Sequence, residues 1–115
     1  MKFVLRDELT MEYEKKWGPI PENNEMDKLI PMLCKADIPF DLGIHMGRPQ
    51  IIYPSFEDCV CDAVLHWGSY GREQGLLEIM GLVDEDAGDD VEGWLTAEQV
   101  FDRILDHYKK NKKTS

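Results

Sequence analysis

The sequence predicts a small α+β domain in which a three-stranded antiparallel β-meander packs against α-helices, in the order α-α-β-β-β-α-α. Two observations lead to this fold class. Residues alternate with a period of two through 40–46 and 59–66, which is typical of strands with one buried face, and residues 50–53 return from a turn between them. The segments on either side have helix-forming composition, and the last of them carries a helix-start motif at Thr96.

A chain of 115 residues has room for one domain with one hydrophobic core. We expect residues 1–24 to form a helical appendage followed by a linker rich in proline and glycine. The α+β domain is expected over 25–110, and residues 111–115 form a basic tail. No apolar stretch approaches the roughly 20 residues of a membrane helix. The N-terminus also lacks a secretory signal, so a cytoplasmic location is expected.

Two helices are expected before the sheet. Residues 5–17 carry a weak apolar stripe, and the glycine and prolines within 18–21 end any helix there. The second helix is expected to begin at a cap on Asp27, which places Pro31 in its first turn. A proline there costs the helix little stability, because the backbone N–H groups of the first turn have no intrahelical acceptor. We expect Pro39 to end this helix.

The first hairpin of the meander is predicted from its turn. Gly47-Arg48 has glycine in the first central position, as a two-residue type II′ turn requires. This turn sets Ile44 opposite Ile51. In the same register Leu42 lies opposite Tyr53, so both strands direct large apolar side chains to one face.

The third strand is predicted from its agreement with the second. Residues 59–66 can be interpreted as a capped helix or as a strand. The strand is favoured because it sets Cys61 beside Tyr53. It also sets Ala63 beside Ile51, on the face already assigned to the core.

The remainder of the domain is predicted to be helical with one acidic loop. A turn at 68–71 leads into a short helix over 76–80, and an acidic loop follows over 84–92. The last helix begins with a capping box, in which the side chains of Thr96 and Gln99 each accept a hydrogen bond from the other residue's backbone N–H.

The charge balance favours binding over catalysis. Thirteen basic and 23 acidic residues give a formal net charge of −10. Because binding to a phosphate backbone needs positive charge, direct binding to nucleic acid is not expected. An acidic surface suits a basic protein partner, although solubility alone explains the charge equally well. Catalytic signatures such as G-x-S-x-G or a phosphate-binding glycine loop are missing, so we expect no enzyme.

The candidate protein-binding surface combines the acidic loop with the turn that precedes the short helix. Exposed aromatic side chains in such a turn suit an interface, although they can equally close the edge of the sheet. The loop lacks the ligand spacing of a calcium-binding EF-hand. The candidate residues are Asp84, Glu85, Asp86, Asp89, Asp90 and Glu92 in the loop, and Trp67, Tyr70 and Arg72 in the turn.

An alternative site lies on the sheet face opposite the core. The predicted register places His45, Gln50, Asp62 and His66 on that face. The two histidines are then about 10 Å apart by strand spacings, too far to share a metal but close enough for a bound ligand to span. A small-ligand or nucleotide-binding protein is therefore the alternative function. A helix packed across this face would remove the site.

No metal or cofactor is expected. Cys59 and Cys61 lack the spacing of a zinc knuckle, and no second cysteine pair completes a tetrahedral site. The odd number of cysteines is typical of reduced thiols rather than of a disulfide framework.

Four motifs carry a resemblance to a known group of proteins: GRPQIIYP (47–54), GSYG (68–71), LLEIMGL (76–82) and WLTAEQVF (94–101). The chain resembles, over roughly residues 26–108, small proteins encoded by phages and prophages of Gram-positive gut bacteria. That family has no assigned activity, so no catalytic residue carries over.

The resemblance implies an accessory protein in the cytoplasm of a bacterial host. With the acidity, it leads to the hypothesis of a modulator of a host or phage protein, in its sharpest form a nucleic-acid-mimicking inhibitor of a defence nuclease. A structural component that acts by oligomerisation is a further alternative.

Overall fold

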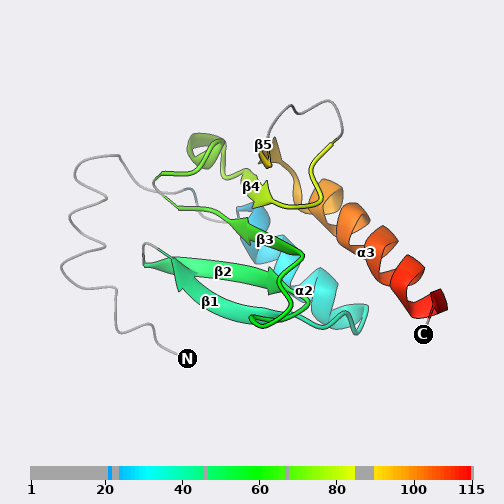
Figure 1. The fold of residues 1–115 in the computed structure, drawn as a ribbon. Helices are drawn as coiled ribbons and strands as arrows, with labels where there is room; N and C mark the ends of the chain where they lie inside the picture. Colours follow the sequence, from blue (N-terminus) through cyan, green and yellow to red (C-terminus); the bar gives the residue numbers. More distant parts are fainter. Residues whose placement is uncertain (1–20, 22–23, 46, 67, 85–89, 115) are drawn as a thin grey trace.

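A computed structural model describes residues 21, 24–45, 47–66, 68–84 and 90–114 (Figure 1). The first expected helix, over 5–17, lies outside these residues. The elements in chain order are α2 (Glu25–Lys35), β1 (Asp41–His45), β2 (Arg48–Tyr53), β3 (Cys61–Val64), the 3-10 helix η1 (Arg72–Gln74), β4 (Leu77–Met80), β5 (Val91–Leu95) and α3 (Ala97–Thr114).

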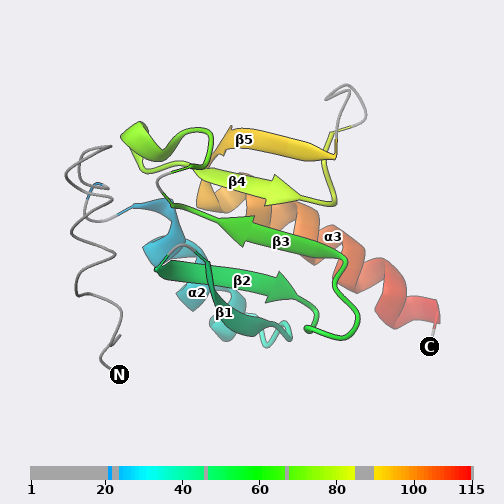
Figure 2. The same ribbon diagram turned by 60° about the vertical axis from the view of Figure 1, so that its left-hand side comes forward.

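The fold is α+β, as predicted, but its meander has five strands instead of three. The strands are all antiparallel and follow the order β1-β2-β3-β4-β5. Helices α2 and α3 both lie against one face of the sheet (Figure 2). Within the described residues no helix covers the opposite face. None of the described helices has the length and apolarity that crossing a membrane requires.

The predicted short helix over 76–80 is wrong, because this segment forms β4. Leu77 and Ile79 are buried, whereas Glu78 is half-buried and Met80 is exposed, which is the period-two pattern of a strand. A single helical turn is costly to nucleate. The edge of β3 instead offers backbone hydrogen-bond partners, and β5 then extends the sheet from a segment for which no strand was predicted.

The turn between β1 and β2 lies one residue earlier in the chain than predicted. His45 pairs with Arg48, and Ile44 pairs with Pro49 rather than with Ile51, so the register differs by two residues. Side chains of β1 still point to the predicted faces of the sheet, because a register shift of two residues preserves the alternation of side chains between the two faces. However, Leu42 and Ile44 remain 52% and 49% exposed, because β1 is an edge strand with a neighbour on one side only.

The predicted third strand is confirmed over 61–64. Ile51 pairs with Ala63 and Tyr53 pairs with Cys61, in the register expected from the sequence. These four side chains are buried in the core between the sheet and the two helices. The core also includes Leu29 and Leu33 of α2, Leu77 and Ile79 of β4, and Val100 and Ile104 of α3.

Helix α2 begins earlier than predicted. Its N-cap is Asn24, whose Oδ1 accepts a hydrogen bond from the backbone N–H of Asp27 at 3.1 Å. Pro31 therefore lies inside the helix rather than in its first turn. The helix ends ahead of Pro39, where Asp37 adopts a left-handed conformation with φ of 56°.

The start of α3 confirms the predicted capping box. The backbone N–H of Gln99 donates to Thr96 Oγ1 at 3.2 Å, and the backbone N–H of Thr96 donates to Gln99 Oε1 at 2.8 Å. A second acceptor comes from α2, because Glu25 Oε1 accepts the backbone N–H of Ala97 at 2.8 Å. The two helices are thus joined at their N-terminal ends.

Candidate functional site

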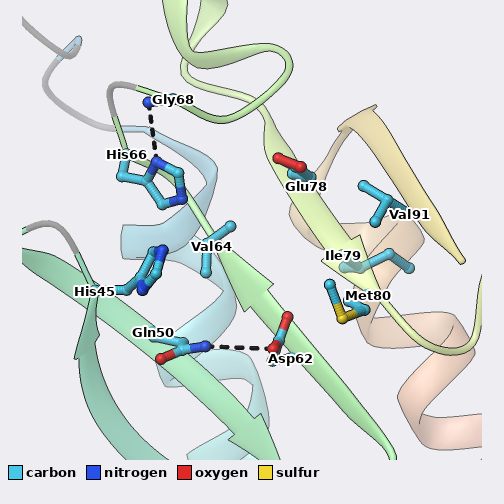
Figure 3. Close-up of a pocket in the computed structure, with 10 residues that line it drawn as sticks. All are labelled: His45, Gln50, Asp62, Val64, His66, Gly68, Glu78, Ile79, Met80 and Val91. Atoms are coloured by element: carbon cyan, nitrogen blue, oxygen red, sulfur yellow. Dashed lines mark hydrogen bonds between the residues drawn. The ribbon is translucent and has the colours of Figure 1, made fainter.

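A cavity of about 240 Å³ opens on the sheet face that the helices leave uncovered (Figure 3). Each of the five strands contributes at least one lining residue, because the cavity runs across the strands. All four residues of the predicted ligand site line it, namely His45, Gln50, Asp62 and His66, and they are joined by Glu78, Met80 and Val91.

The two histidines lie closer together than the sequence predicted. Their ring centroids are 4.8 Å apart, whereas the predicted separation was about 10 Å from strand spacings. The two-residue difference in register is the cause. His45 pairs with Arg48, and the β2–β3 register continued past Val64 brings His66 level with the same arginine. The predicted offset of about two residues between His45 and His66 along the strands is therefore absent.

The hydrogen bonds of His66 determine which ring nitrogen carries its proton. Its Nδ1 accepts the backbone N–H of Gly68 at 2.9 Å, so the neutral ring is protonated at Nε2. That second nitrogen faces the lined space (Figure 3). Burial, with a contribution from His45, lowers the pKa of His66 to about 4. At neutral pH His66 is therefore an uncharged hydrogen-bond donor in the cavity.

Among the described residues, the hydrogen-bond donors to the two cavity carboxylates are neutral groups. Asp62 Oδ2 accepts from Gln50 Nε2 at 3.3 Å, and Glu78 Oε2 accepts from the backbone N–H of Tyr70 at 3.2 Å. Within the described residues, no salt bridge joins either carboxylate to a lysine or arginine. Burial raises the pKa of both groups, and the charge of Asp62 raises that of Glu78 further.

Several lining residues were missed by the sequence prediction, among them Glu78, Met80 and Val91. Glu78 and Met80 were assigned to a helix, and Val91 was assigned to a loop, so none was placed on the open sheet face. The alternation of Leu77 and Ile79 with Glu78 and Met80 was the available signal. Four residues were too few for that signal to exclude a helix.

The donor set of the cavity does not suit a metal ion. The described residues contain no group of three or more histidine, cysteine, aspartate or glutamate side chains that could hold one. In addition, His66 uses Nδ1 to accept from Gly68 and carries its proton on Nε2, so neither nitrogen presents a free lone pair. The cavity is better suited to an organic ligand.

The structure describes only part of the predicted acidic surface. Glu85, Asp86, Asp89 and Trp67 lie outside the described residues. Asp84 and Asp90 are exposed. Glu92 faces α3, where Arg103 binds it through two hydrogen bonds of 2.6 and 2.9 Å. The carboxylate of Glu92 is thus already occupied within the fold.

The turn that follows β3 presents one of its predicted interface residues. Tyr70 is exposed and stacks against Trp94, with ring centroids 5.2 Å apart and an interplanar angle of 19°. Arg72 is the first residue of η1, and its Nη2 lies 3.6 Å from Glu73 Oε1. Trp94 was not among the predicted interface residues, and β5 brings it to this turn.

No family model matches the chain, and no curated protein or solved structure matches it. The resemblance to phage-encoded proteins therefore stays a prediction from the sequence motifs.

Proposed function

We propose that this chain is a non-enzymatic binding protein whose open-face cavity binds the cationic head of a small organic ligand, an amine or a guanidinium. The observation that carries the proposal is the presence of Asp62 and Glu78 in one cavity, where no salt bridge of the described residues joins either to a lysine or arginine and the nearby charge of His45 does not outweigh the burial that raises their pKa values. Both carboxylates are half-buried, and removing a charge from water is costly unless the charge is paired. A bound cation would supply the missing partner and offset the burial that raises both pKa values.

The size and charge of the cavity narrow the ligand class. Its volume of about 240 Å³ lies below the roughly 300–1,000 Å³ of cavities that enclose drug-sized molecules. It therefore suits a head group rather than a whole nucleotide. A phosphate would also meet two carboxylates on a chain of net charge −10. The nucleotide version of the predicted site is accordingly disfavoured.

The remaining lining residues complement an amine or guanidinium that is carried on an alkyl stem. The carboxylates accept hydrogen bonds from the cation, and His66 donates from Nε2 to an acceptor elsewhere on the ligand. Val64, Met80 and Val91 provide apolar surface for methylene groups. Such a cavity discriminates between ligands chiefly by charge.

The test is a calorimetric titration with N-acetylarginine amide and its uncharged analogue N-acetylcitrulline amide. We expect the citrulline compound to bind at least about tenfold more weakly, because it forfeits charge-assisted hydrogen bonds of about 1.5–3 kcal/mol. We expect Asp62→Asn to weaken binding of the arginine compound by a similar factor. Asp102→Asn, at an exposed position on α3, serves as the matched control.

Binding should also weaken as the pH falls and the carboxylates are protonated. Since burial raises the pKa of Asp62 and Glu78, this loss should begin at a higher pH than it does for exposed carboxylates. Equal affinity for the charged and neutral analogues would overturn the proposal. Unchanged affinity in Asp62→Asn would do the same.

A further inference from the structure

An exposed aromatic pair lies beside the cavity. Tyr70 is 57% exposed and Trp94 is 58% exposed, and the two rings stack on one another. A second hollow of about 140 Å³ adjoins them and is also lined by Arg72, Glu73 and Gln74, with Arg72 in a salt bridge to Glu73. Large aromatic side chains that remain this exposed are typical of interfaces rather than of a domain core.

The backbone holds this aromatic pair in place. Between the pairs Leu77–Leu95 and Ile79–Glu92, β5 has one residue more than β4, which makes a bulge. Trp94 lies in that bulge with φ of 56°, a left-handed conformation that costs a side-chain-bearing residue about 1 kcal/mol or more. Strain of this kind concentrates at functional sites.

Two glycines allow the turn to approach β5 closely. A Cβ atom on Gly93 would lie 2.3 Å from Tyr70 Cβ, and one on Gly71 would lie 3.1 Å from the backbone nitrogen of Trp94. The backbone N–H of Trp94 also donates to the Tyr70 carbonyl at 3.3 Å. The stacked rings are therefore positioned by backbone contacts and are preorganised for a partner.

A hydrogen bond joins the aromatic pair to the cavity. The backbone N–H of Tyr70 donates to Glu78 Oε2 at 3.2 Å, and Glu78 is one of the two cavity carboxylates. The bulge sets Gly93 and Trp94 opposite Glu78 in the sheet. The rings and the cavity thus form neighbouring parts of one surface.

We infer that the cation bound by the cavity belongs to an arginine-rich segment of another protein, with one guanidinium between Asp62 and Glu78 and a second stacked on the exposed rings of Tyr70 and Trp94. This inference rests on the proposed function. A planar guanidinium both pairs with carboxylates and stacks on aromatic faces. The net charge of −10 attracts a basic segment, and tethering two weak contacts strengthens both.

The test compares three blocked compounds: N-acetylarginine amide, acetyl-Arg-Gly-Gly-Arg-amide and acetyl-Arg-Gly-Gly-Ala-amide. We expect the peptide with two arginines to bind at least about tenfold more tightly than the other two compounds. Trp94→Gly should abolish that gain and leave the affinity for N-acetylarginine amide unchanged. Glycine accepts the positive φ at this position, so the variant should keep the fold. Phe56→Ala removes another exposed aromatic, 59% accessible, and is the matched control.

The outcomes separate this inference from the proposed function. Failure of N-acetylarginine amide to bind overturns the proposed function. Binding of that compound without a gain from the second arginine overturns only the inference, and so does an equal gain from the alanine peptide. A wild-type dimer that Trp94→Gly dissociates, with no gain from the second arginine, would assign the rings to a second copy of this chain and would also overturn it.

Discussion

At the scale of single residues, His66 illustrates how a buried polar side chain is made compatible with the sheet. It is 8% exposed, and its Nδ1 and its backbone groups are held by Gly68 and Ser69. These bonds favour the neutral ring, and burial lowers the pKa from 6.5 to about 4. The fold is therefore stabilised by keeping this histidine uncharged.

The stability of the fold should decline in acid because of His66. A group whose pKa is depressed by folding contributes stability above its unfolded pKa, and this stability is lost as the pH falls toward about 4. Between pH 7 and 4, we expect the wild type to lose about 2 kcal/mol more of its unfolding free energy than His66→Asn. Asparagine retains an acceptor for the Gly68 N–H but does not titrate.

Urea unfolding at several pH values would measure this difference. The charged and titratable groups around His66 are His45, Asp62 and Glu78 in the cavity and Arg48 on β2, and they are common to both proteins. His45→Asn should reduce the acid loss only in part, because the charge of His45 contributes to the lowered pKa of His66 while burial, the larger cause, remains. Parallel pH profiles for the wild type and His66→Asn would contradict the assignment.

At the scale of secondary-structure elements, Glu25 stabilises two helices at once. It lies in the first turn of α2, pairs with Lys28 at 2.7 Å, and accepts the first backbone N–H of α3. Burial raises its pKa, but the hydrogen bonds from Lys28 and Ala97 outweigh burial and hold the pKa below its usual value. The carboxylate therefore contributes most of its stabilisation at neutral pH.

Removing this connection should destabilise the domain. We expect Glu25→Ala to lower the free energy of unfolding by about 1–2 kcal/mol, because the Ala97 N–H loses its acceptor and the N-terminus of α3 loses a negative charge. Glu98→Ala changes an exposed acid in the first turn of α3 and should cost no more than about 0.5 kcal/mol. Chemical denaturation at pH 7 measures both values, and equal losses in the two variants would argue against the connection.

At the scale of the whole molecule, the charge balance is the dominant property. The chain has 23 acidic and 13 basic side chains, so ten carboxylates remain in excess of all its lysines and arginines. The prediction that this acidity recruits a basic partner, including the version in which it imitates nucleic acid to inhibit a nuclease, stays a prediction. Glu92 contributes less to it than the sequence suggested, because Arg103 already occupies its carboxylate.

Salt should stabilise this protein against heat. Like charges repel one another in the compact state, and raising the salt concentration from about 0.02 M to about 0.5 M shortens the Debye length from roughly 20 Å to about 4 Å. We therefore expect the Tm to rise with sodium chloride concentration in a calorimetric scan. A constant or falling Tm would mean that local salt bridges, rather than the net charge, dominate the electrostatic free energy.

The sequence predicted the parts of the fold that depend on local pattern. The capping box at Thr96 and the register between β2 and β3 involve residues close together in the chain, and both are confirmed. The faces of His45, Asp62 and His66 followed from the alternation of side chains, so the candidate cavity residues were placed on the correct side of the sheet. Interactions between residues close together in the chain were enough to determine these features.

The tertiary structure decided the features that depend on neighbours far apart in the chain. Residues 77–80 have too little pattern of their own to exclude a helix, and the hydrogen-bonding edges of β3 and β5 make them a strand. That pairing brings Glu78 into the cavity and Trp94 beside Tyr70. A backbone left unpaired at a sheet edge is satisfied by whichever strand lies next to it. This choice of partner is not encoded in the alternation of any one segment.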